Sequence, residues 1–212
     1  MSPSTVFSYW CFTLAIVYVV NSLTENNEAV RDTSFSKLRS GERYYILPGG
    51  RGFGGGITPM PGDDECTSGV VQEQEEVSSG ISVTFVPVDA KKGTIRLLAD
   101  INIKFSSSDA DSRKVSSCGS SLVWQLGNYN ETLKQYFVTT GGMEGNPSSG
   151  NVRSWFKIER YEKYYNLMFC PTVCPFCKVM CRNVGIYVED DGVRRLALSD
   201  TPFVIMFKPV EY

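Results

Sequence analysis

The sequence places four of its seven cysteines within twelve residues, in the stretch CPTVCPFCKVMC. Four closely spaced thiolates can bind zinc, a Cys-x-x-Cys pair can exchange electrons with a substrate, and cysteines that oxidise together form disulfides. Disulfides persist in oxidising compartments, whereas zinc-binding thiols must stay reduced. The chemistry of this cluster therefore depends on the compartment in which the protein lies. Its four residues are Cys170, Cys174, Cys177 and Cys181.

The N-terminal residues predict entry into the secretory pathway. Residues 6–20 are apolar apart from a few hydroxyl groups, and the polar stretch NSLTENNE follows them. This run is shorter than the roughly 20 residues of a membrane-spanning helix and fits the hydrophobic region of a signal peptide. An uncleaved anchor helix is the alternative. We place cleavage after Ser22, so residues 1–22 are the predicted signal peptide and residues 23–212 the predicted mature domain.

Cleavage at this point removes Cys11 and leaves six cysteines. An even number in a secreted chain predicts disulfides, three in this case, although the spacing alone does not choose among the possible pairings. Oxidising conditions argue against a zinc site. A redox Cys-x-x-Cys motif normally opens a helix, and no helical pattern follows Cys174. We therefore predict that the cluster is a disulfide staple.

The chain contains no histidine. This absence excludes a Ser-His-Asp triad, a Cys-His dyad and any zinc or haem site with a histidine ligand. Two acidic runs, residues 63–65 and 189–191, offer carboxylate pairs to a glycosidase, but adjacent acids at turns are usually just solvated. The 21 Lys and Arg residues nearly balance the 23 Asp and Glu residues, which favours neither nucleic acid nor an anionic membrane as a partner. We expect no enzyme, no cofactor and no metal.

The elements that must position any functional residue are short β-strands. Twelve segments of about 4–8 residues are rich in β-branched and aromatic side chains and bounded by turn-forming residues. No stretch keeps a helical apolar period over three turns, so we expect almost no helix. The pattern predicts one all-β domain, a barrel or a sandwich. The expected strands are residues 44–48, 55–60, 82–87, 94–97, 101–105, 122–127, 135–142, 155–161, 164–170, 184–190, 194–199 and 203–209.

Three stretches resemble the plant Kunitz-type family, that of soybean trypsin inhibitor. RDTSFSKLRSGERYYILPGGRGFGGGI resembles the N-terminal segment of these proteins, YFVTTGGMEGNP resembles a middle segment, and the sequence from WFKIERY through the cysteine cluster to FVIMF is similar to the miraculin-like branch. The resemblance covers about residues 28–208. It implies an all-β fold of the β-trefoil type, with six two-stranded hairpins, three closing a barrel and three capping it.

The same resemblance implies how the cysteines pair. It joins Cys66 to Cys118, Cys170 to Cys181, and Cys174 to Cys177. The last bond would lie inside the ring that Cys170 and Cys181 close, so it should add little further loop-closure stabilisation. Together with the predicted signal peptide, it implies a plant protein that is secreted through the endoplasmic reticulum to the apoplast or cell wall. No second apolar run of that length follows, so we expect no membrane attachment after cleavage.

In the resembling inhibitors one exposed loop enters the active site of a serine protease like a substrate. The matching loop here is residues 87–94, PVDAKKGT, from Pro87 to Thr94. Aligning back from Phe105 makes Lys91 the P1 residue, flanked by Ala90 and Lys92. A shift of one residue makes Lys92 the P1 residue, followed by Gly93. Either lysine suits a trypsin-like protease with an Asp-floored S1 pocket.

Two residues favour a different function for this loop. Active members carry an Asn that braces the reactive loop from within, and the matching position here is Ser40, whose shorter side chain supports the loop less well. Gly93 adds backbone freedom. The alternatives are therefore a non-inhibitory miraculin-like defence, storage or binding protein, or an inhibitor of papain-like cysteine proteases acting through another loop.

Two further features belong to a secreted Kunitz-type chain. Asn130 begins an Asn-Glu-Thr glycosylation sequon in an expected surface turn. The taste-modifying member of the miraculin-like branch depends on histidines and on an additional cysteine that forms a disulfide-linked dimer. This chain has no histidine, and no cysteine in ERYEKYYN where that protein has one. We therefore expect neither taste modification nor a covalent dimer, but a monomer.

Overall fold

The computed structural model describes residues 28–61, 68–107 and 121–211. The predicted signal peptide, Cys66, Cys118 and the acidic run 63–65 lie outside the described residues. Among the described residues, no helix is long and apolar enough to cross a membrane. The elements of the described part are β1 (Tyr44–Pro48), β2 (Ile57–Pro61), β3 (Ser68–Gln72), β4 (Val83–Pro87), η1 (Ala90–Lys92), β5 (Ile101–Phe105), β6 (Gln125–Asn130), β7 (Gln135–Thr139), η3 (Ser149–Ser154), β8 (Lys157–Tyr161), β9 (Tyr164–Phe169), β10 (Arg182–Val188), β11 (Arg194–Ser199) and β12 (Val204–Pro209), where η denotes a 3-10 helix.

Six of the strands close a barrel. β1 pairs with both β12 and β4, β4 pairs with β5, β8 with β9, and β9 with β12, all antiparallel. The ring closes where Ile101 of β5 bridges Phe156, the residue just before β8. Alternate residues of β1 and β4 are buried, because a strand that presents one face to a core buries every second side chain.

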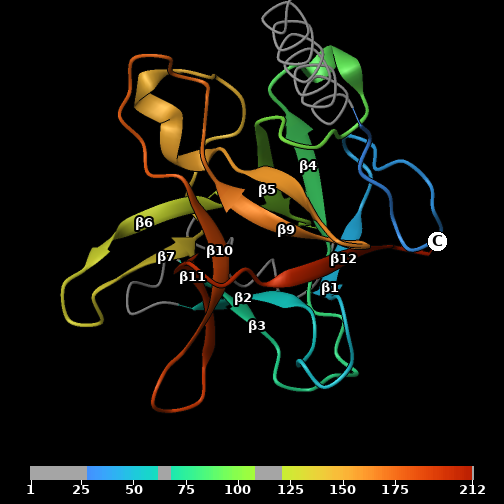
Figure 1. The fold of residues 1–212 in the computed structure, drawn as a ribbon, viewed down its shortest axis with the longest axis vertical. Coiled ribbons are helices and arrows are strands. Elements are labelled where there is room, and N and C mark those ends of the chain that lie inside the picture. Colours follow the sequence, from blue (N-terminus) through green and yellow to red (C-terminus); the bar gives the residue numbers. More distant parts are fainter. Residues whose placement is uncertain (1–27, 62–67, 108–120, 212) are drawn as a thin grey trace, which may run out of the picture.

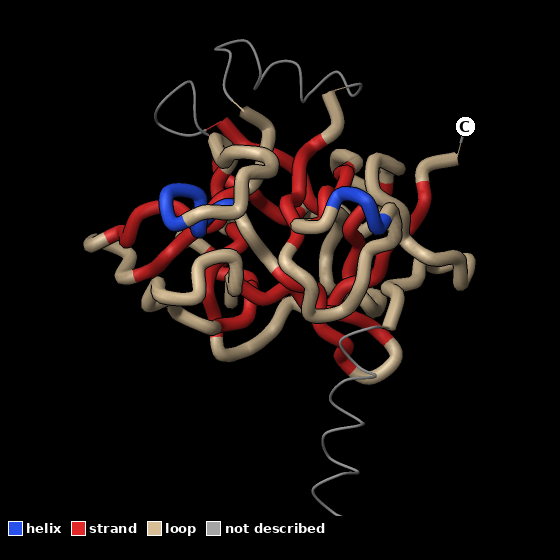
Figure 2. The backbone as a smooth tube through the Cα atoms, turned by 90° about the horizontal axis from the view of Figure 1, so that it is seen from above, coloured by secondary structure: helices blue, strands red, loops and turns tan. Residues whose placement is uncertain are grey.

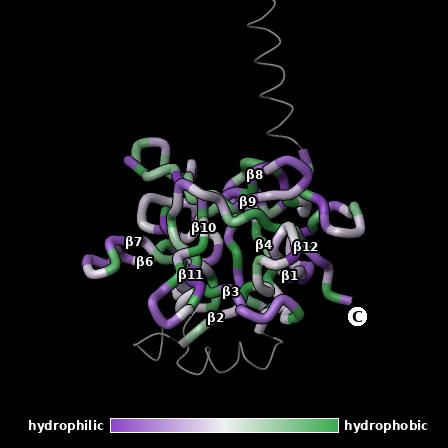
Figure 3. The backbone as a smooth tube through the Cα atoms, turned by 60° about the horizontal axis from the view of Figure 1, so that its bottom comes forward, coloured by the Kyte–Doolittle hydropathy of each residue, from purple (hydrophilic) through white to green (hydrophobic). Residues whose placement is uncertain are grey.

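Aromatic side chains fill much of the barrel interior. Phe85 of β4 and Phe207 of β12 meet edge to face, with 5.5 Å between ring centroids, and Tyr165 of β9 lies 5.6 Å from Phe207. All three side chains are buried. Edge-to-face packing adds to the burial of apolar area, so these rings help to specify the barrel. Figure 3 shows hydrophobic segments gathered along the strands and hydrophilic segments in the outer turns.

Three two-stranded hairpins, β2–β3, β6–β7 and β10–β11, form the cap. Their second strands pair in every combination, β3 with β7, β3 with β11, and β7 with β11. This triangle above a six-stranded barrel is a β-trefoil, as the resemblance implied. In Figure 1, β6, β7, β10 and β11 lie on one side and β1, β4, β5 and β12 on the other.

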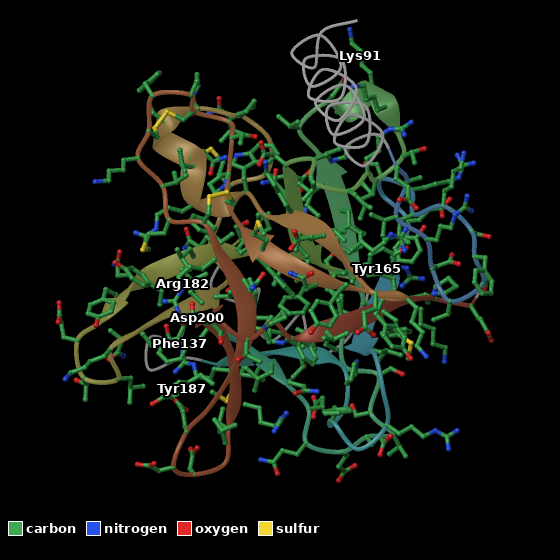
Figure 4. The ribbon with its side chains drawn as sticks, viewed as in Figure 1. Lys91, Phe137, Tyr165, Arg182, Tyr187 and Asp200 are labelled. Carbon is green, nitrogen blue, oxygen red and sulfur yellow. A yellow bond between two sulfur atoms is a disulfide. The ribbon has the colours of Figure 1, made fainter. Side chains whose placement is uncertain are left out.

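A stacked cluster joins two of the cap hairpins. The Arg195 guanidinium of β11 lies 4.3 Å from the ring centroid of Phe137 on β7, and it forms an ion pair with Glu189 at 3.2 Å. Tyr187 of β10 meets Phe137 edge to face at 5.5 Å, and Figure 4 shows these two rings together. Cation–π and edge-to-face contacts therefore reinforce the single β7–β11 backbone pairing.

The predicted strand boundaries hold at several positions. The ranges 44–48, 101–105 and 194–199 coincide with β1, β5 and β11. The range 94–97 was wrong, because Thr94 and Arg96 form only isolated bridges, with Arg39 and Ala29, as the chain crosses the N-terminal segment. β3 was missed because its first two residues are types that favour turns. The range 122–127 begins three residues before β6, whose first residue is Gln125. The described helical segments are short 3-10 helices.

The N-terminal segment, residues 28–40, lies against the chain that follows the predicted reactive loop. The Val30 N–H donates to the Ile95 carbonyl at 3.0 Å, and the Ile95 N–H donates to the Leu38 carbonyl at 2.9 Å. The Arg31 N–H donates to the Tyr165 hydroxyl at 2.9 Å, which ties the segment to the barrel. Figure 2, seen from above, shows the 3-10 helices of the described part, η1 and η3, as blue segments that lie far apart in this view.

Candidate functional site

The loop of residues 87–94 projects from the barrel between β4 and β5. It contains η1, whose three residues Ala90, Lys91 and Lys92 are all exposed, and it ends at Gly93 in the left-handed region with φ 58°. An L residue with a side chain is strained at this φ, whereas glycine adopts it readily. Figure 4 shows the Lys91 side chain pointing away from the body of the protein. The structure therefore presents the predicted P1 region on the surface, as a 3-10 turn.

The turn itself is held by few interactions. The Lys92 N–H donates to the Asp89 carbonyl at 3.0 Å, and the Thr94 N–H donates to the Lys92 carbonyl. Lys92 Nζ lies 3.4 Å from Asp89 Oδ2, with the two side chains 63% and 47% exposed. Within the described residues Lys91 forms no ion pair. The two adjacent lysines therefore differ. Lys92 has a carboxylate close to its ammonium group, whereas the ammonium group of Lys91 is exposed to solvent without a carboxylate partner among the described residues.

Ser40 lies at the base of this loop. Its N–H donates to the Gly93 carbonyl at 2.8 Å, and its hydroxyl donates to the Phe85 carbonyl at 3.1 Å. These bonds join the strand before the loop to the residue that ends the turn. Among the described residues, the Ser40 hydroxyl makes no hydrogen bond to a carbonyl between Asp89 and Lys92. Ser40 thus braces the two ends of the loop and leaves its tip unsupported.

Tyr44 fixes the backbone next to Ser40. Its hydroxyl accepts a hydrogen bond from the Arg39 N–H at 3.0 Å and donates one to Glu42 Oε2 at 3.0 Å. The side chain is buried. Burial raises the pKa of Tyr44 to about 12; the Arg39 hydrogen bond opposes this shift and the Glu42 carboxylate adds to it. The phenol therefore stays neutral and holds Arg39 in place over the ordinary range of pH.

Asp100 links the other end of the loop to the cysteine cluster. Its carbonyl accepts the Val88 N–H at 2.9 Å. Its carboxylate accepts the Thr172 N–H at 3.1 Å and the Thr172 hydroxyl at 2.5 Å, and it lies 3.8 Å from Lys157 Nζ. Sequence reasoning did not identify this residue. In the sequence, Asp100 is a single acidic residue between two apolar segments, which hints at a buried carboxylate. Its partners Thr172 and Lys157 are distant in sequence, so the sequence does not show what the carboxylate contacts.

The cysteine cluster forms a clasp, residues 170–181, closed by two disulfides. Cys170 is bonded to Cys181, and Cys174 to Cys177, so these four sulfurs are not free thiolates for zinc or redox chemistry. Phe176 stands between the inner pair and is 83% exposed. Figure 4 shows the clasp sulfurs and Lys91 toward the same end of the molecule. The clasp is therefore a second projection at this end of the molecule, and Asp100 links it to the lysine loop through Thr172 and Val88.

A family model described as "Trypsin and protease inhibitor", that of the legume Kunitz proteins, matches residues 30–209. The chain belongs to the Kunitz family of plant protease inhibitors. The description of the family is that of protease inhibitors and not of enzymes. The match spans the barrel, the cap, the lysine loop and the clasp.

Individual Kunitz proteins resemble the chain over most of its length. Kunitz trypsin inhibitor 5 of Arabidopsis thaliana is 48% identical over 182 residues, 85% of each chain. Miraculin of Synsepalum dulcificum is 44% identical over 191 residues, covering 86% of this chain and 84% of miraculin. The solved structure of a Kunitz-type cysteine protease inhibitor from potato is 32% identical, with a TM-score of 0.72 over 87% of this chain and 98% of that one. Kunitz relatives therefore include proteins named as inhibitors of different protease classes.

The remaining predicted sites of this Kunitz chain lie away from the loop and the clasp. Asn130 is the last residue of β6, where its Oδ1 accepts the Leu133 N–H at 2.9 Å. The acidic run 189–191 forms the β10–β11 turn. There Glu189 pairs with Arg195, and Asp191 Oδ1 accepts the Val193 N–H at 3.0 Å. These two carboxylates therefore stabilise the turn.

Proposed function

We propose that this chain is a secreted, monomeric inhibitor of trypsin-like serine proteases, with Lys91 as the P1 residue. The observation that carries the proposal is an exposed lysine without a counter-charge, on a loop bonded at both ends. Lys92 is the weaker candidate because its ammonium group already lies 3.4 Å from Asp89. A lysine that enters an S1 pocket must give up such a partner, and Lys91 has none to lose among the described residues.

The bonds at the base of the loop explain how a substrate-like segment can inhibit. A protease that cuts after Lys91 leaves one new end tied through Val88 to Asp100, and the other tied through Gly93 to Ser40. Neither end can diffuse away, so the cut ends stay close together and the peptide bond can form again. Slow turnover follows from these two attachments, and the two ordered ends of the loop lose little entropy on binding.

The 3-10 turn must open before a protease can bind the loop in the extended form that pairs with a binding cleft. Opening breaks the hydrogen bond from Lys92 to Asp89 and the exposed ion pair between the same residues. The cost is on the order of 1–2 kcal/mol, against about 12 kcal/mol for a nanomolar complex. The turn therefore weakens inhibition by roughly tenfold and does not prevent it.

Titration of trypsin with the disulfide-intact secreted protein tests the proposal. We expect stoichiometric inhibition, and at most one slow cut after Lys91 by mass spectrometry. Lys91→Ala should weaken inhibition at least about 100-fold, because a P1 side chain is a central anchor of its interface. Lys92→Ala should change it less than about tenfold, and Lys178→Ala, on the clasp, is the matched control. Rapid cleavage of the loop, or equal loss with Lys92→Ala, would contradict the assignment of Lys91.

A second candidate is inhibition of a papain-like cysteine protease through the clasp. Phe176 supports it, because a largely exposed aromatic side chain on a disulfide-closed turn is a suitable anchor for an apolar pocket. Parallel titrations of papain separate the two candidates. Inhibition that survives Lys91→Ala and is lost with Phe176→Ala assigns the clasp, and the reverse pattern assigns the lysine loop. A defence, storage or binding role without protease inhibition would leave both titrations flat.

A further inference from the structure

The structure contains a cavity that the proposed inhibitory function does not use. Its volume is about 560 Å³, within the range of roughly 300–1,000 Å³ that is typical of small-molecule sites. The β1–β2 loop, the β8–β9 turn and the β11–β12 turn border it, and no residue of the lysine loop or the clasp lines it. Most of the wall is aromatic or aliphatic, from Phe53, Tyr161, Tyr164, Ile186, Phe203 and Val204.

Two of the aromatic side chains that line the cavity remain accessible to solvent. Phe53 is 63% exposed and Tyr161 is 42% exposed, although both are large hydrophobic residues. Exposed aromatic surface gathered around a concave site is unfavourable in water, and an apolar ligand would cover it. The rings also offer faces for stacking against a planar molecule. The cavity is therefore suited to an aromatic ligand.

One positively charged side chain that lines the cavity, that of Arg194, is held in a fixed orientation. Arg194, the first residue of β11, donates from Nε to Gln72 Oε1 at 2.9 Å. Gln72 is 2% exposed, and its Nε2 donates to the carbonyls of Phe53 at 2.6 Å and Gly55 at 3.0 Å. Because the amide nitrogen is committed to two carbonyls, the amide oxygen must face Arg194. Gln72 thus positions the guanidinium beside the cavity.

The positive charge of Arg194 is not neutralised by a direct partner. No carboxylate of the described residues forms an ion pair with it. Glu162 also lines the cavity but is exposed at the β8–β9 turn, where solvent screens it. Lys163, next in the chain and also exposed, offsets Glu162, and its Nζ lies 5.1 Å from the Tyr164 ring centroid. The half-buried Arg194 is then the remaining charge of the wall and favours an anion, because a guanidinium binds carboxylate or sulfonate oxygens in a fork geometry.

We propose that this cavity binds small aromatic anions, with the rings against Phe53, Tyr161 and Tyr164 and the carboxylate or sulfonate on Arg194. The site is separate from the lysine loop, so a ligand and a protease can bind the same molecule. The proposal does not depend on protease inhibition, because every group it uses lies outside the loop and the clasp.

The test uses a pair of fluorescent probes that differ in charge. 1-Anilinonaphthalene-8-sulfonate carries the anionic group, and N-phenyl-1-naphthylamine has the same rings without it. We expect saturable binding of the sulfonate at one site per disulfide-intact chain. Arg194→Gln should weaken the sulfonate about 10- to 100-fold, as loss of a charged hydrogen bond predicts, and change the neutral probe less than about twofold.

Two further variants make the result decisive. Arg182→Gln is the matched control, because Arg182 forms an exposed ion pair with Asp200 (labelled in Figure 4) and does not line the cavity. It should bind both probes as the unmodified chain does. Phe53→Ala removes an exposed wall residue and should weaken both probes. Any of three results would overturn the proposal. They are the absence of saturable binding, an unchanged affinity of Arg194→Gln for the sulfonate probe, and a loss of sulfonate affinity in Arg182→Gln equal to that in Arg194→Gln.

Discussion

The hydroxyl of Tyr44 joins the barrel to the segment that carries Ser40, and its ionisation links stability to pH. The folded-state pKa of about 12 lies above the ordinary value of 10.0 because the phenol is buried. Folding therefore favours the neutral form. Its contribution to stability is fully present below pH 10 and is lost as the pH rises from about 10 through about 12, since the unfolded chain ionises first.

We predict that Tyr44→Phe removes this part of the pH dependence. At pH 7 the variant should lose about 1 kcal/mol, because the Arg39 N–H and Glu42 lose their partner. Between pH 10 and pH 12 the gap between the melting temperatures of the two proteins should shrink. Tyr129→Phe is the matched control for removing one phenol hydroxyl, since Tyr129 is 40% exposed. A gap that stays constant across this range would show that Tyr44 does not titrate as described.

At the scale of elements, the two disulfides of the clasp contribute unequally. Cys170 and Cys181 are 11 residues apart and close a loop that bears no regular secondary structure, whereas Cys174 and Cys177 are 3 apart within it. In the chain-entropy account, the outer bond lowers the entropy of the unfolded chain and so stabilises the folded state by about 3 kcal/mol. The inner bond closes a ring inside one that is already closed, so it lowers the entropy of the unfolded chain by little more.

We predict that Cys170→Ser with Cys181→Ser lowers the free energy of unfolding by about 3 kcal/mol, measured by urea denaturation. Cys174→Ser with Cys177→Ser should lower it by less than about 1 kcal/mol, because the outer bond persists. The inner variant serves as the matched control, since it also replaces two cysteines in the same segment. Equal losses in the two variants would contradict the nested arrangement.

At the scale of the whole molecule, Asp100 connects the barrel, the lysine loop and the clasp. Its side chain is 6% exposed and lies near Lys157, which is 11% exposed on β8. Thr172, at the start of the clasp, donates to the same carboxylate. Removing the Asp100 charge leaves the nearly buried Lys157 ammonium group without an anion, which lowers stability strongly. Removing the charges of both Asp100 and Lys157 lowers stability much less.

We predict that Asp100→Asn lowers the free energy of unfolding by about 3 kcal/mol and that adding Lys157→Met recovers at least half of the loss. Asp200→Asn, which breaks the exposed pair with Arg182, should cost less than about 1 kcal/mol. Chemical denaturation of the unmodified chain and these three variants checks the prediction. If Asp100→Asn and Asp200→Asn cost the same, Asp100 does not act as a buried link.

Much of the molecule could be predicted from sequence because the controlling signals are local. The two-residue period of β1 and the composition of β5 predict strands whatever lies beside them. The absence of histidine excluded whole classes of catalytic site. The lysine loop was identified by the resemblance to Kunitz inhibitors, and counting back from Phe105 then placed its P1 residue. The strands depend on residues close together in the chain, so local patterns could predict them.

The tertiary structure decided what each polar group contacts. Asp100 meets Thr172 across 72 residues, and Gln72 positions Arg194 across 122. The difference between Lys91 and Lys92 depends on an Asp89 contact that the two adjacent letters do not reveal. Hydrogen bonds and ion pairs act over a few ångströms, so they depend on which distant segments the barrel and cap bring together. The sequence by itself determined most of the strands and the chemistry available to them, and packing decided where that chemistry lies.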